Sequence, residues 1–67
     1  MFKTKTKIIL LDRDWNEVFR YKSNMKPIEG EFIYIEGLKS YYKVFKVVHS
    51  IMDTNKIILV VEKVEGL

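Results

Sequence analysis

The segment from Pro27 to His49 constrains the fold of this chain more than any other part of its sequence. It reads Pro-x-x-Gly-Glu-x-Ile-x-Ile-x-Gly-x4-Tyr-x-Val-x-x-Val-x-His. Pro27 fixes its own backbone φ and holds the preceding residue extended, whereas Gly30 can adopt the positive φ of a turn. The pattern predicts a strand over 31–36, a tight turn at 37–39 and a longer strand over 40–51.

The longer strand should bend in its middle. Tyr42 and Val44 share one face of an ideal strand, but Val47, His49 and Ile51 fall on the other face. One extra residue near Phe45–Lys46 would restore the phase, and a β-bulge supplies such a residue. A bulged, bent strand is how a small sheet folds over toward closure.

The rest of the chain also has the two-residue period of strands. Residues 3–11 alternate, with the threonines, Ile8 and Leu10 on one face and Lys3, Lys5 and Lys7 on the other. A turn over 12–16 leads to a strand over 17–22, and a turn over 52–56 leads to one over 57–64. The prediction is an all-β, single domain over residues 1–67: a small, five-stranded, partly open antiparallel barrel with a bulged fourth strand.

Composition limits the class of protein. The chain has 67 residues, 48% of them apolar, no cysteine and a formal net charge of +3. A chain this short has a marginal core, and no disulfide or thiolate metal site can reinforce it. Its longest uncharged apolar stretch, 57–61, is far shorter than a membrane span. We therefore expect a cytoplasmic protein with no membrane partner.

These motifs resemble those of SH3-like barrels, and in particular a short, uncharacterised type found in phages and mobile elements. The resemblance covers roughly residues 6–64 and is carried by Pro27, Gly30, Glu31, Ile33, Gly37, Tyr42, Val44 and Val47. Similar chains open with an Asp-x-Asp-Gly-Asn turn. Asp12, Asp14 and Asn16 match that turn, but Trp15 stands where glycine is expected. The resemblance implies an SH3-like barrel and leaves function open, since small barrels serve many functions.

No catalytic, cofactor or metal site emerges from the residues. The Asp12-x-Asp14-x-Asn16 start of a calcium loop lacks the required glycine and the closing glutamate. His49 is the only histidine, and Ser50 should point to the opposite face. Glu29 and Glu31 belong to a turn. We expect a protein that is not an enzyme.

Two surfaces are candidates for binding. Trp15 at a hairpin tip, beside Arg13, either packs on the barrel end or acts as an exposed anchor. The strand phase places Tyr34, Tyr41, Phe45, Ile57, Leu59 and Val61 outside if Ile33, Ile35, Tyr42, Val44, Ile58 and Val60 fill the interior. Either a tightly coiled barrel packs both faces, or a homodimer or partner protein covers this stripe.

The expected function is a protein-binding module, such as a phage or mobile-element accessory or inhibitor protein with a host protein as partner. Its predicted partner-binding residues are Arg13, Trp15, Tyr34, Tyr41, Lys43 and Phe45. The alternative is a nucleic-acid-binding barrel, because lysines at 39, 43 and 46 interleave with aromatic residues and the N-terminal half is basic.

Overall fold

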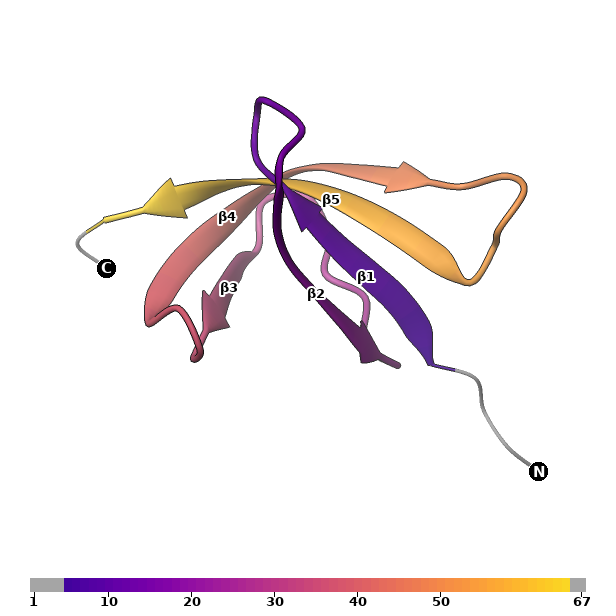
Figure 1. The fold of residues 1–67 in the computed structure, drawn as a ribbon, viewed down its shortest axis with the longest axis horizontal. Helices are drawn as coiled ribbons and strands as arrows, with labels where there is room; N and C mark the ends of the chain where they lie inside the picture. The colour runs from indigo at the N-terminus through magenta and orange to yellow at the C-terminus, as the bar shows by residue number, and fades with distance from the viewer. Residues whose placement is uncertain (1–4, 66–67) are drawn as a thin grey trace.

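The computed structural model describes residues 5–65, and within them the chain forms five strands and no helix (Figure 1). The strands are β1 (Thr6–Leu11), β2 (Glu17–Ser23), β3 (Phe32–Ile35), β4 (Ser40–His49) and β5 (Lys56–Val64). These bounds agree closely with the predicted ones, except that β4 ends at His49 rather than at Ile51. Lys3 and Thr4 of the predicted first strand lie outside the described residues.

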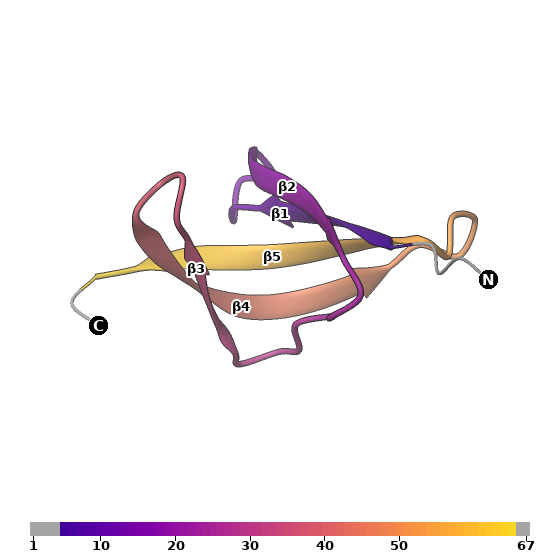
Figure 2. The same ribbon diagram turned by 90° about the horizontal axis from the view of Figure 1, so that it is seen from below.

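The five strands form one sheet in the order β2-β1-β5-β4-β3. The sheet curls into a half-barrel whose edges are β2 and β3 (Figure 2). The prediction of a small, all-β, partly open SH3-like barrel is confirmed. One detail was wrong: β1 and β5 pair in parallel, so the sheet is mixed rather than wholly antiparallel. The loop over 24–31 carries the chain from one edge of the sheet to the other. Successive strands alternate in direction, so the fifth strand runs the same way as the first.

Backbone hydrogen bonds from the Pro27–Glu31 motif attach the end of this loop to the middle of β4. Gly30 has a φ of 93°, as the turn requires, and its N–H donates to the carbonyl of Val44 at 2.9 Å. The N–H of Val44 in turn donates to the carbonyl of Glu31 at 2.8 Å. The Glu31 side chain accepts a further bond from the N–H of Ile28 at 2.7 Å, which closes the turn. The motif thus sets where β3 begins.

The predicted bulge in β4 is confirmed at Phe45. Val44 pairs with Val61 of β5 and Lys46 pairs with Val60, so Phe45 is left over between two successive partners. An extra residue on one strand increases the local bend and twist. β4 accordingly curves along its length beside β5 (Figure 2).

The core lies on one face of the sheet, which we call the inner face. It consists of Ile8, Leu10, Ile35, Val44, Ile57, Leu59 and Val61, with Val18, Tyr21, Ile33, Tyr42 and Val47 packed against them. The opposite face is the outer face. The alternation predicted for β1 is confirmed over the described residues, because Thr6, Ile8 and Leu10 are buried while Lys5 and Lys7 are exposed.

The phase predicted for β5 was wrong. Ile57, Leu59 and Val61 were expected outside, yet they are only 3%, 0% and 1% exposed and belong to the core. Their neighbours Ile58 and Val60 were expected inside and lie on the outer face instead. The reason is that all five residues from 57 to 61 are apolar, so the sequence has no alternation there. Register decides the phase: Ile57 pairs with Ile8 and Leu59 with Leu10.

Candidate functional site

The turn between β1 and β2 is a short loop held together by Asp12. Its side-chain Oδ1 accepts bonds from the N–H groups of Asp14 and Asn16, each at 2.9 Å. Its backbone N–H donates to the carbonyl of Asn16 at 2.9 Å, and its carbonyl accepts from the N–H of Trp15 at 3.0 Å. Asp12 therefore uses both its side chain and its backbone to close the turn.

Trp15 occupies the left-handed position of this turn, with a φ of 65°. A three-residue hairpin loop usually places glycine there, as the resemblance had indicated. A residue with a Cβ in this conformation costs about 1–2 kcal/mol. Packing of the indole into the core does not offset this cost, because Trp15 is 63% exposed. Of the two alternatives for this residue, exposure at the hairpin tip is the one observed.

Arg13, on the same turn, reaches across β5 to the bulge of β4. Its Nε lies 3.4 Å from Oε2 of Glu62 on β5. Its Cζ lies over the ring of Phe45, 4.2 Å from the centroid. An ion pair and a cation–π contact thus fix one guanidinium between two strands. The bulge makes this contact available, since it removes Phe45 from the regular ladder.

Arg13, Trp15 and Phe45 line one hollow together with Lys46 and Val60. We call these five residues the Trp15 cluster. The hollow has a volume of about 390 Å³. Val60 is its buried member at 7% exposed, although it lies outside the main core. The Trp15 cluster combines a buried aliphatic residue, two aromatic rings and two cationic groups.

Tyr34 and Tyr41 form a second aromatic group on the outer face. They are directly opposite in the β3–β4 ladder, and their ring centroids are 4.7 Å apart. Both are partly exposed, at 47% and 40%. Lys43 lies one row closer to the Trp15 cluster, opposite Phe32 on β3 and Glu62 on β5.

All six predicted partner-binding residues therefore lie on or beside the outer face, but in two groups. Arg13, Trp15 and Phe45 are brought together, and the tyrosine pair is separate from them. Sequence reasoning missed Phe32, Val60 and Glu62. Lys46 was named at the predicted bulge and in the nucleic-acid alternative, but not among the residues expected to bind a protein partner. The two residues of β5 needed the strand register.

The remaining residues that the sequence suggested for metal binding or catalysis do not form such a site in the described part of the chain. Within residues 5–65, no group of three histidine, aspartate or glutamate side chains is placed to hold a metal ion. The Ser50 hydroxyl accepts a bond from the N–H of Asp53, and His49 is exposed at the end of β4. Glu31 closes its own turn, as described above.

Three side chains of β2 have pKa values shifted from their ordinary values. A hydrogen bond from Arg20 lowers the pKa of Glu17, and the same bond raises the pKa of Arg20. Burial raises the pKa of the Tyr21 hydroxyl. None of these side chains belongs to the Trp15 cluster.

A hollow of about 350 Å³ lies at the open seam between the two edge strands. It is lined by Phe19, Tyr21, Ile33, Tyr34, Ile35, Glu36 and Gly37. Most of these side chains face inward from β2 and β3, so this hollow is where the half-barrel fails to close. Its lining contains one charged side chain and no polar cluster that would orient a small ligand.

The described residues contain no helix of the length and apolarity needed to cross a membrane. Comparison with known proteins adds no relative: no protein-family model, no curated protein and no solved structure matches this chain.

Proposed function

We propose that this protein is a non-enzymatic protein-binding module whose contact surface is the outer face around the Trp15 cluster. The observation that carries the proposal is the conformation of Trp15. Its backbone is left-handed, with a φ of 65°, and its side chain is 63% exposed. Unfavourable backbone conformations in small proteins are typically retained where they serve a function.

The composition of the surface favours a protein partner. Tryptophan, tyrosine and arginine dominate the residues that contribute most to protein–protein binding. Arg13 is already held by Glu62 and Phe45, so little of its freedom remains to be lost on binding. Glu62 and Asp14 lie beside the cationic groups. A surface of mixed charge suits a protein better than a uniform polyanion.

The resemblance to phage and mobile-element barrels indicates what kind of protein the partner is. An accessory or inhibitor protein of such an element acts on a component of its host. We therefore propose a host protein as the partner and the Trp15 cluster, extended by Lys43 and the tyrosine pair, as the contact surface.

The test is affinity capture from host lysate with immobilised protein, with and without nuclease. We expect a captured protein that resists nuclease and is lost with Trp15→Gly. Glycine removes the indole while accepting the left-handed backbone, so the fold is retained. Lys39→Gly is the matched control, since Lys39 also has a positive φ, of 50°, but lies in the β3–β4 turn. Capture by Lys39→Gly should equal that of the unmodified protein.

A second candidate function is the binding of single-stranded nucleic acid. Lys43 and Lys46 alternate with Tyr41 and Phe45 along β4, and bases stack on such rings while lysines contact phosphates. This candidate predicts that nuclease abolishes capture and that affinity falls steeply with salt. Capture that survives nuclease but does not depend on Trp15 would contradict the proposed surface.

The outer face could also pair with a second copy of the chain. Three residues of the predicted apolar stripe are buried in the core, so the area left for such a contact is smaller than the sequence indicated. Sedimentation equilibrium at high protein concentration separates the two cases. A strict monomer that still captures a partner would favour a host protein over a homodimer.

A further inference from the structure

The turn between β4 and β5 presents two apolar side chains to solvent. Ile51 and Met52 are 91% and 95% exposed, more than any other large apolar residue in the described part of the chain. They are adjacent in sequence, and the β4–β5 turn that carries them lies at one end of the molecule, away from the β1–β2 turn (Figure 1). An exposed apolar pair of this kind costs solubility and usually marks a contact. We call these two residues the apolar tip.

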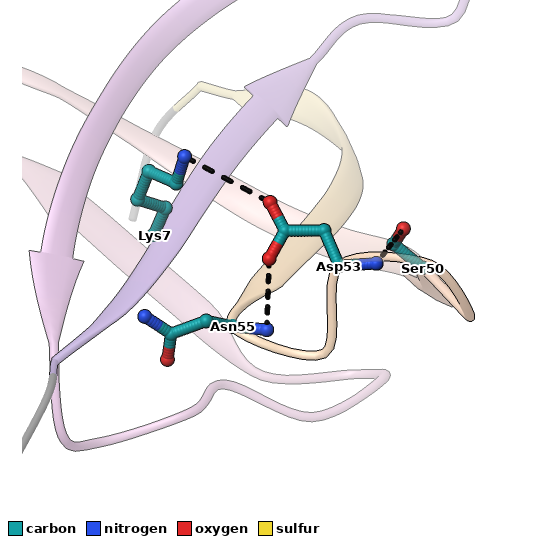
Figure 3. Close-up of polar contacts among 4 residues, drawn as sticks. All are labelled: Lys7, Ser50, Asp53 and Asn55. Carbon is teal, nitrogen blue, oxygen red and sulfur yellow. Dashed lines mark hydrogen bonds and ion pairs between the residues drawn. The ribbon is translucent and has the colours of Figure 1, made fainter.

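Hydrogen bonds and an ion pair hold the base of this turn. The N–H of Asp53 donates to Oγ of Ser50 at 3.1 Å, and the N–H of Asn55 donates to Oδ1 of Asp53 at 3.1 Å. Lys7 reaches over from β1, and its Nζ lies 3.8 Å from Oδ2 of Asp53 (Figure 3). The backbone N–H of Lys7 also donates to the carbonyl of Asn55 at 2.8 Å. The apolar tip therefore belongs to a turn whose base is held by hydrogen bonds and an ion pair.

Beside this turn, three lysines form a row across three neighbouring strands. Lys7 of β1 lies directly opposite Lys22 of β2 on one side and Lys56 of β5 on the other. All three are on the outer face. Like charges directly opposite each other destabilise a sheet. Within residues 5–65, Asp53 is the only acid that forms an ion pair with this lysine row.

We propose that the lysine row and the apolar tip together form a contact for an anionic phospholipid surface. The row supplies charge that anionic headgroups would neutralise, and the tip supplies aliphatic side chains that can enter the acyl boundary. The ion pair between Lys7 and Asp53 joins the two parts. A single binding mode thereby accounts for both an exposed apolar pair and an unfavourable row of like charges.

Duplex DNA is the competing polyanion, and the chemistry of the tip disfavours it. An apolar wedge enters DNA only after a base step has been unstacked, whereas insertion at a lipid interface has no such preceding cost. Arg20, on β2 beside the row, is bonded to Glu17 and is therefore not free to read base edges. A peripheral contact needs no spanning segment, so the shortness of the apolar stretch 57–61 does not exclude it.

The test is sedimentation of the full chain with vesicles, either of phosphatidylcholine alone or of equal parts phosphatidylcholine and phosphatidylserine. We expect binding to the mixed vesicles only. Lys22→Gln and Lys56→Gln should each weaken it about fivefold. Ile51→Ser/Met52→Ser should weaken it more than tenfold, since two buried aliphatic side chains are lost.

Matched variants separate these effects from general changes in charge or hydropathy. Lys63→Gln removes an exposed lysine from the other end of β5, and Met25→Ser removes a methionine that is 80% exposed in another loop. Both should bind mixed vesicles as the unmodified chain does. Trp15→Gly should also bind normally, so this proposal and the proposed function can fail independently. Thermal melting of every variant confirms that each is folded.

Three results would overturn the proposal. One is the absence of binding to mixed vesicles by the unmodified chain. Another is equal binding to phosphatidylcholine vesicles, which would remove any role for the lysine row. The third is a duplex DNA probe that displaces the protein from vesicles and whose own affinity falls with Ile51→Ser/Met52→Ser, because the tip would then be a DNA wedge.

Discussion

The guanidinium of Arg13 lies over the ring of Phe45, with Cζ 4.2 Å from the ring centroid. Arg13 belongs to the β1–β2 turn and Phe45 is the bulged residue of β4, so the contact links two segments distant in sequence. β5 runs between them and contributes Glu62, which pairs with the same guanidinium at 3.4 Å. The bulge that bends the barrel thus also supplies the ring against which Arg13 is held.

The Arg13–Phe45 contact predicts a measurable coupling. Arg13→Gln, Phe45→Leu and the double variant form a cycle whose interaction free energy should be about 0.5–1 kcal/mol, as expected for an exposed cation–π pair. Urea unfolding monitored by circular dichroism measures it. The same cycle with Arg13 and Lys39, which lies in the β3–β4 turn and shares no partner with Arg13, is the control and should show additive effects. Additivity between Arg13 and Phe45 would mean that the stacking contributes nothing in solution.

Trp15→Gly should raise the free energy of unfolding, by up to about 1 kcal/mol. Glycine relieves the left-handed conformation, and this gain exceeds the entropy that glycine adds to the unfolded chain. Lys39→Gly should act in the same direction for the same reason. The urea concentration at the unfolding midpoint measures this change in stability, provided that the dependence of the unfolding free energy on urea is the same for each variant. A marked loss of stability in Trp15→Gly would show that the indole packs on the barrel and would remove the argument for an exposed anchor.

The phase of β5 can be tested with two neighbouring residues. Leu59→Ala should lower the free energy of unfolding by about 2–4 kcal/mol, because Leu59 is fully buried in the core. Ile58→Ala, on the outer face, should lower it by about 1 kcal/mol. In a domain of this size each kcal/mol shifts the melting temperature by roughly 4–8 °C. Equal losses at the two positions would contradict the observed register.

Tyr21 should make the fold sensitive to alkaline pH. Burial raises its pKa in the folded state above the ordinary value of 10.0. The unfolded chain therefore ionises first, so the contribution of Tyr21 to stability is complete below pH 10.0 and is lost as pH rises through the folded-state pKa. Tyr21→Phe should lose less stability between neutral and strongly alkaline pH. Melting temperatures of both proteins, measured across that pH range, test this prediction. An equal fall in melting temperature with pH for the two proteins would contradict it.

Much of the fold was predictable because the determining signals are local. The alternation of residues 3–11 defined the faces of β1, and the positive φ expected at Gly30 is observed. The phase break between Val44 and Val47 located the bulge at Phe45. Even Trp15 was identifiable as a residue standing where glycine belongs. Each of these inferences needs only a few consecutive residues.

The candidate site was predictable only in part. Arg13 and Trp15 share a turn and were expected together, but their meeting with Phe45 depends on how the β1–β2 turn lies over β5. Val60 and Glu62 had no signal in the sequence, since their role follows from being neighbours of other strands. The lysine row is of the same kind, because Lys22, Lys7 and Lys56 become adjacent only through strand pairing.

The sequence by itself determined the strands, the turns between them and the place of the bulge, because period, glycine, proline and phase act over a few residues. Tertiary structure alone decided that β5 runs parallel to β1 and which face of β5 is buried. The physical reason lies in residues 57–61, which are all apolar and can present either face to a core. Their orientation was settled by pairing with Ile8 and Leu10, some fifty residues earlier in the chain.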